Sequence, residues 1–111
     1  SPQRFHQQIE GGVAQGLGYA LMEDFKTREG KPLTQDLTGY LVPGALDLPD
    51  TVSVILPAHE STGPFGLKGV GEVAMNGALP GVANAVAEAL GGRVFHGPST
   101  AEKVLGAIVG F

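Results

Sequence analysis

The clearest candidate for chemistry in this 111-residue chain is the glycine-rich segment GLKGVGE at residues 66–72. Its glycines leave backbone N–H groups bare, so the segment can approach a ligand closely, and a single acid, Glu72, ends it. Such a loop can hold an anionic cofactor and offer a base beside it. A structural turn that ends in a solvated glutamate has the same composition, so composition alone leaves both interpretations open.

Other kinds of site match less well. Residues 69–74 fit the letters of the G-x-G-x-x-A dinucleotide fingerprint, but the predicted strand ends near Leu56 and Glu72 would face the pyrophosphate. A Walker phosphate loop is excluded because its glycine–lysine order is broken here. The chain has three widely separated histidines, His6, His59 and His96. Their spacing predicts no metal site.

Apolar periodicity predicts the element before the loop. Apolar residues recur every four positions between residues 9 and 25, which indicates an amphipathic helix over residues 7–26. Its interior glycines are Gly11, Gly12, Gly16 and Gly18. Each costs about 1 kcal/mol relative to alanine, so either another helix packs tightly here or a cofactor lies over the helix N-terminus. The amides of Gln8 and Gln15 are typical of a helix surface.

Between this helix and the loop, the sequence predicts little regular structure. Residues 27–36 indicate a polar turn, and residues 38–42 indicate a short extended stretch. Residues 51–56 alternate apolar and polar side chains, which predicts a half-buried strand that Pro57 ends.

After the loop, a second helix is expected to carry an apolar stripe over residues 78–90. Pro80 would lie in its first turn and Gly91 would form its C-terminal cap. Residues 93–96 are expected to form a short strand, and Ser99 with Glu102 to form the capping box of a last helix. The predicted fold class is α+β: one domain over residues 1–111, with a small sheet packed against two or three helices.

Composition narrows the function. Only 16% of the residues are charged, which suggests that part of the surface is normally covered. The net charge of −4 and the lack of a basic run argue against nucleic acid and against an anionic membrane surface. With no cysteine, the chain has no iron–sulfur ligands of its own. The start at Ser1 suggests an excised fragment, and a cytoplasmic location is the default expectation.

Four segments resemble the C-terminal part of the molybdopterin-binding subunit of the xanthine dehydrogenase and aldehyde oxidase family of molybdenum hydroxylases. They follow the family's order: QIEGGVAQGLGYAL (8–21), LVPGALDLPD (41–50), TGPFGLKGVGE (62–72) and ANAVAEALG (83–91). Together they span nearly the whole chain. The chain is therefore expected to be the C-terminal portion of a molybdopterin-binding domain.

The resemblance implies the following roles. Glu72 would be the essential base of a reaction that hydroxylates an aldehyde or N-heterocycle carbon with water. Gln8 would contact a molybdenum–molybdopterin cofactor, and the backbone of Lys68, Gly69, Val70 and Gly71 would lie against it. No residue of this chain is expected to ligate the metal.

The partners implied by the resemblance lie outside this chain. The cofactor would be shared with upstream segments of the same subunit, and iron–sulfur clusters and FAD would sit on partner domains or subunits. A small molecule would be the substrate, and the isolated piece would be inactive. The alternative is a non-catalytic interaction domain that keeps the fold.

Overall fold

The computed structural model describes residues 1–92 and 96–110. This part of the chain forms three α-helices and one two-stranded sheet, so the predicted α+β class is confirmed. The helices and strands are α1 (Pro2–Leu21), β1 (Thr27–Arg28), β2 (Lys31–Pro32), α2 (Val73–Leu90) and α3 (Ala101–Val109). Two 3₁₀ turns, η1 (Ala45–Asp47) and η2 (Pro64–Gly66), lie in the connection between β2 and α2.

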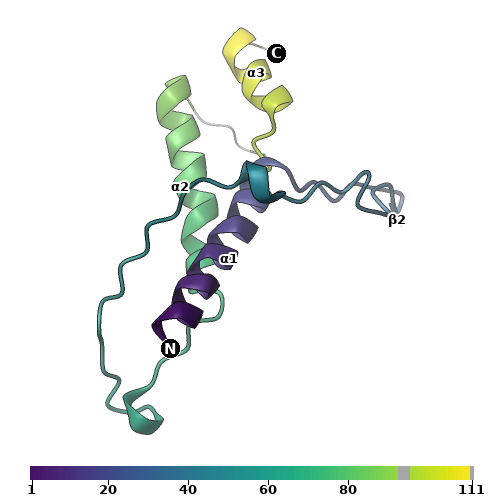
Figure 1. The fold of residues 1–111 in the computed structure, drawn as a ribbon. Helices are drawn as coiled ribbons and strands as arrows, with labels where there is room; N and C mark the ends of the chain where they lie inside the picture. The colour runs from purple at the N-terminus through teal and green to yellow at the C-terminus, as the bar shows by residue number, and fades with distance from the viewer. Residues whose placement is uncertain (93–95, 111) are drawn as a thin grey trace.

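Helices α1 and α2 lie side by side and form the main interface between elements (Figure 1). A β-carbon added at Gly12 would lie 2.8 Å from Cβ of Ala74, and one at Gly16 would lie still closer to Cβ of Ala78. Side-chain carbons do not normally approach so closely, so a larger residue at either glycine would overpack the interface. Close helix packing therefore explains the glycines at these two positions.

Helix α1 begins and ends earlier than predicted. Pro2 lies in its first turn, where proline's fixed φ and missing N–H are tolerated. At the other end, the Gly18 carbonyl accepts from the N–H groups of Met22 at 2.9 Å and Glu23 at 2.8 Å, which ends the helix. Phe25 was expected in the helix but lies beyond it.

The chain returns to the end of α1 after the hairpin. The Tyr40 hydroxyl donates to Oε2 of Glu23 at 2.5 Å, and this bond to a carboxylate raises the pKa of Tyr40 to about 12. A β-carbon added at Gly18 would collide with the other carboxylate oxygen of Glu23 and with the ring of Pro43. The glycine at position 18 thus makes room for this return.

Helix α2 has the predicted C-terminal cap but a different start. Gly91 adopts the left-handed φ of 64° that favours glycine at a helix end. The helix begins at Val73, ahead of the predicted stripe, because its first turns pack against the glycines of α1. Pro80 therefore lies inside the helix, and its expected place in the first turn was wrong.

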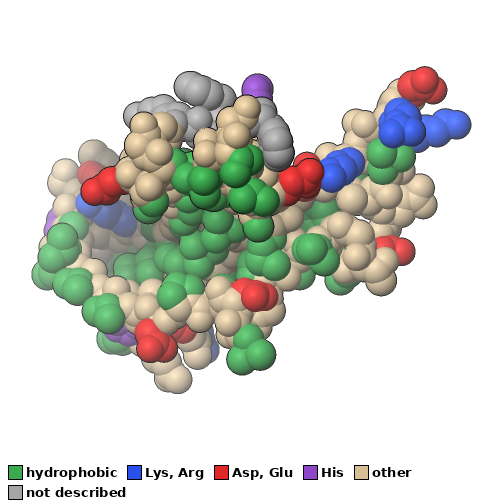
Figure 2. All heavy atoms as spheres, turned by 90° about the horizontal axis from the view of Figure 1, so that it is seen from above, with side chains coloured by type: hydrophobic (Ala, Val, Ile, Leu, Met, Phe, Trp, Pro, Cys, Tyr) green, Lys and Arg blue, Asp and Glu red, His purple; other side chains and the backbone are tan. Residues whose placement is uncertain are grey.

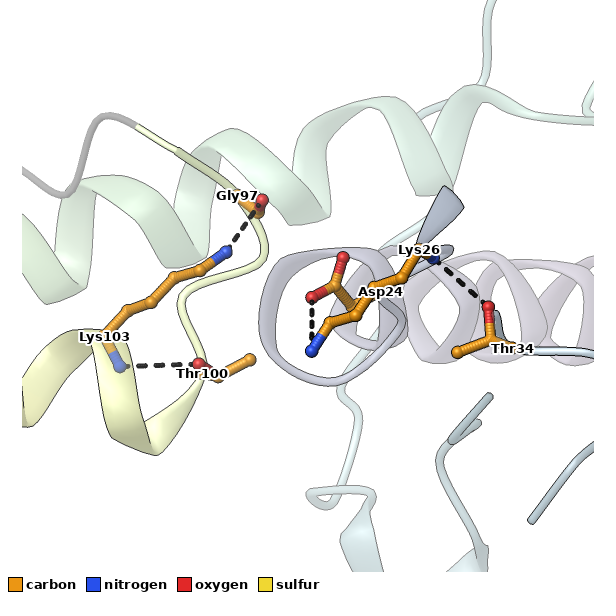
Figure 3. A network of polar contacts seen from close by, with 6 residues as sticks. All are labelled: Asp24, Lys26, Thr34, Gly97, Thr100 and Lys103. Carbon is orange, nitrogen blue, oxygen red and sulfur yellow. Dashed lines mark hydrogen bonds and ion pairs between the residues drawn. The ribbon is translucent and has the colours of Figure 1, made fainter. Parts of the chain in front are cut away.

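Helix α3 is capped by Thr100, so the predicted capping box of Ser99 and Glu102 was wrong. The Thr100 hydroxyl accepts from the backbone N–H of Lys103 at 3.4 Å (Figure 3). Ser99 instead donates its N–H to the carbonyl oxygen of Ala20 at 2.6 Å. This contact fastens the segment before α3 to the end of α1.

The sheet is a short hairpin that projects from the helices (Figure 1). Thr27 pairs with Pro32, and Arg28 pairs with Lys31. A turn replaces the first part of the extended stretch that was predicted at residues 38–42. It forms because the hydroxyl and the backbone N–H of Thr38 both donate to the carboxylate of Asp36. These bonds lower the pKa of Asp36.

The strand predicted at residues 51–56 is not formed. In the described part of the chain this segment has no ladder partner, and a strand exists only when its backbone is paired. The segment still alternates in exposure. Val52, Val54 and Leu56 are 90%, 77% and 82% exposed, while Thr51 and Ser53 are half-buried. The strand expected at residues 93–96 falls largely on residues outside the described ranges.

The described residues enclose almost no core. Ala20, at 6% exposure, is the buried hydrophobic side chain. Figure 2 shows apolar side chains gathered over the helices, while charged side chains mark the projecting hairpin. No helix in the described ranges is long and apolar enough to cross a membrane. A layer of helices with an open apolar face needs a covering layer.

Candidate functional site

The turn at residues 60–66, which leads into the glycine-rich loop, is held by its own hydrogen bonds. In η2, Phe65 and Gly66 have left-handed φ values of 54° and 71°, and the ring of His59 lies against Gly66 where a side chain would collide. Thr62 donates to the Glu60 carboxylate through its backbone and its hydroxyl, which lowers the pKa of Glu60. The loop is therefore anchored before it reaches residue 67.

Glu72 stands where the loop becomes helix α2. It is the N-cap residue, and its backbone carbonyl accepts from the N–H groups of Met75 at 3.1 Å and Asn76 at 3.2 Å. Its side chain is exposed and makes no capping hydrogen bond. No ion pair between Glu72 and Lys68 occurs within residues 1–92 and 96–110. The fold thus fixes the backbone of Glu72 and leaves its carboxylate exposed and able to contact a ligand.

Gln8 reaches this loop from helix α1. Its Nε2 donates to the carbonyl oxygen of Gly71 at 2.9 Å, although the two residues are 63 positions apart. The structure therefore brings together two of the residues singled out in the sequence, next to Glu72. Gln15, further along α1, donates to the hydroxyl of Tyr19 at 3.3 Å and remains a surface amide.

A cleft of about 470 Å³ lies against residues 66–70 of the loop. It is lined by Phe5, Ile55, Leu56, Pro57, Ala58, Gly66, Leu67, Lys68, Gly69, Val70 and Val73. Lys68, Gly69 and Val70 were predicted to contact a cofactor, and the others were not. Phe5 could have been found, because it lies four residues before Ile9 and extends the apolar stripe by one turn.

The backbone of residues 69–71 is open enough to hold an oxygen-rich ligand. A β-carbon added at Gly69 or Gly71 would meet no atom within 4 Å. The hydrogen bonds of the described residues do not use the N–H groups of Gly69, Val70 or Gly71 as donors. Free N–H groups beside the exposed Lys68 ammonium suit phosphate or pterin oxygens. This stretch therefore fits an anionic cofactor.

The contacts that the structure gives for His6 and His59 are with residues outside 69–71. Nδ1 of His6 forms a hydrogen bond with the Ser53 hydroxyl, and His59 packs on Gly66. No group of three or more metal-ligating side chains gathers in the ranges that the structure describes. His6 and His59 are thus used for a hydrogen bond and for packing, respectively.

Known proteins resemble the chain in sequence and fold. A family model described as "Molybdopterin cofactor-binding domain" matches residues 1–49. "Probable hypoxanthine oxidase XdhD" of Escherichia coli (strain K12) is 37% identical over 91% of this chain, and "Aldehyde oxidoreductase" of Megalodesulfovibrio gigas is 39% identical over 91%. The crystal structure of quinoline 2-oxidoreductase from Pseudomonas putida 86 matches 97% of the chain with a TM-score of 0.89 and 34% identity. The chain spans 11%, 11% and 14% of these proteins.

Proposed function

The chain belongs to the family of molybdopterin-binding subunits of xanthine dehydrogenases and aldehyde oxidases. We propose that it forms one wall of a molybdenum hydroxylase site. In this proposal Glu72 is the catalytic base. The observation that carries the proposal is the position of Glu72 at the end of the open glycine backbone. It directly follows Gly71, whose carbonyl oxygen accepts a hydrogen bond from Gln8. Activity, substrate and partners belong to the complete protein, of which this segment is a small share.

The cofactor would be held by the backbone of residues 68–71. The free N–H groups of Gly69, Val70 and Gly71 donate to oxygens of the group, and Lys68 supplies a positive charge. Gln8 retains a second N–H and its amide oxygen, so its bond to Gly71 leaves it able to touch the cofactor as well. When bound, molybdenum–molybdopterin supplies the two-electron redox chemistry of the hydroxylation.

Glu72 acts on protons. A carboxylate oxygen of Glu72 would take the proton from the oxygen that derives from water, while this water-derived oxygen bonds to an aldehyde or N-heterocycle carbon. The hydrogen on that carbon would leave with two electrons, which pass to the bound cofactor. The availability of the carboxylate supports this role, because it makes no capping bond. A positioned general base contributes about 10²–10⁴ in rate. In the proposal, the electrons leave through iron–sulfur clusters to FAD on partner domains or subunits.

The remainder of the molybdopterin-binding subunit is the proposed covering layer for the apolar faces of this chain. The exposed side chains of Val52, Val54 and Leu56 and the open face in Figure 2 support this assignment. A strand-like segment with one apolar face fits the edge of a sheet, because pairing would satisfy its backbone and bury that face.

The test of the base is Glu72→Gln in the complete enzyme. The substitution is nearly isosteric, but an amide has no usable basicity at neutral pH. We expect normal molybdenum content, and reduction of the metal centre by substrate slowed at least about 100-fold. The exposed Glu10→Gln on α1 is the matched control and should react normally. Reduction within a few-fold of wild type would refute the assignment of Glu72 as the base and leave the glycine-rich loop as structure only.

A further inference from the structure

One line of contacts joins α1 to the loop and to α2. Gln8, Gly12 and Gly16 are spaced by four residues and therefore share one face of α1. Gly12 and Gly16 lie against Ala74 and Ala78 of α2, which are also four residues apart. Gln8 lies one turn before Gly12, and its partner Gly71 lies just before α2 begins. The glycine contacts thus set the register that brings Gln8 to Gly71.

We infer that Gln8 is a positioning residue for Glu72. Its amide holds the Gly71 carbonyl at 2.9 Å, and that carbonyl belongs to the peptide bond joining Gly71 to Glu72. Fixing this peptide plane limits the directions in which the Glu72 side chain can leave the backbone. The catalytic consequence rests on the proposed role of Glu72, whereas the restraint on the loop does not.

The loop needs such a restraint because its own residues supply little. Gly69 and Gly71 have no β-carbon to limit their backbone angles, and both are surrounded by open space. The turn at residues 60–66 is anchored through η2 and His59, and the helix begins only at Val73. Between these fixed ends, among the residues that the structure describes, the Gln8 amide is the side chain that bonds to the backbone next to the base.

The test compares Gln8→Glu with Gln7→Glu in the complete enzyme. Both changes add one negative charge to the same turn of α1, and Gln7 is an exposed neighbour. Only Gln8→Glu removes the N–H that reaches Gly71, because a carboxylate cannot donate at neutral pH. We measure hydrogen exchange of the amides at residues 69–72, molybdenum content, kcat and KM.

For Gln8→Glu we expect faster exchange at residues 69–72 and, per bound molybdenum, a kcat about three- to tenfold lower at a nearly unchanged KM, in keeping with the loss of one hydrogen bond. Gln7→Glu should match wild type in all four measurements. If Gln8→Glu fails to fold, Gln8→Met removes the donor without adding charge and should give the same result.

Two outcomes would overturn the inference. Unchanged exchange with loss of molybdenum would make Gln8 a cofactor ligand only, with no hold on the loop, and unchanged exchange with unchanged kcat would leave it without a role. The proposed base fails separately: if Glu72→Gln stays active while Gln8→Glu loosens the loop, the restraint holds but its catalytic consequence does not.

Discussion

Gly12 of α1 and Ala74 of α2 are packed so closely that a β-carbon on the glycine would lie 2.8 Å from Cβ of the alanine. The neighbouring Gly11 points away and would meet nothing within 4 Å. Two adjacent glycines in one helix therefore have different reasons to be there, and substitution separates them.

The first prediction concerns this pair. Gly12→Ala should lower the free energy of unfolding by about 1–3 kcal/mol because the added methyl group overpacks the interface. Gly11→Ala should raise it by about 0.5–1 kcal/mol, because alanine favours a helix and has space here. Denaturation of the complete subunit measures both. Equal effects at the two positions would contradict the observed packing.

A valine at either contact glycine is a stronger test of the link to the cofactor. Gly12→Val or Gly16→Val should push α2 away from α1 and move the start of α2, where Glu72 lies. We expect loss of folded protein or of bound molybdenum in the complete subunit. Metal analysis and a melting curve indistinguishable from wild type would show that this register does not control the site.

The isolated chain should neither hydroxylate substrates nor bind molybdopterin. Lys68, Gly69, Gly71 and Glu72 are exposed in this structure, and one open wall cannot bury a cofactor. Metal analysis of the purified chain is the measurement. Molybdenum bound at one equivalent per chain would contradict the prediction.

Residues 51–56 should become a paired strand in the complete subunit. Their amides are expected to exchange slowly there and quickly in the isolated chain, because pairing protects backbone N–H groups. The amides of α2 in the complete subunit provide the internal reference for a protected backbone. Fast exchange of residues 51–56 in the complete subunit would rule out the proposed covering strand.

Tyr40 gives a pH-dependent prediction. Its folded pKa of about 12 lies above the ordinary value of 10.0 because it donates to Glu23. The raised pKa means that this bond contributes its full stability below pH 10, and that the contribution is lost as the pH rises toward 12. Absorbance titration should show the late ionisation, and Glu23→Gln should bring it back toward 10. An unchanged titration in that variant would remove Glu23 as the cause.

Local signals in the sequence were sufficient for several elements. The four-residue apolar repeat predicted α1, and Gly91 predicted the end of α2, because both depend on neighbours within a turn or two. The glycines of residues 66–72 likewise predicted a loop, and helix α2 begins only after it, at Val73. These features are determined by residues close to them in the chain.

The tertiary structure decided what depends on distant partners. The pairing of Gln8 with Gly71 follows from the contacts of α1 with α2, and no local pattern encodes a contact across 63 positions. Helix α3 is capped by Thr100 and not by Ser99, whose N–H donates to the distant carbonyl of Ala20. Residues 51–56 kept their strand pattern without a strand, because a β-strand needs hydrogen-bonding groups from another segment, and in the described part of the chain none is in place.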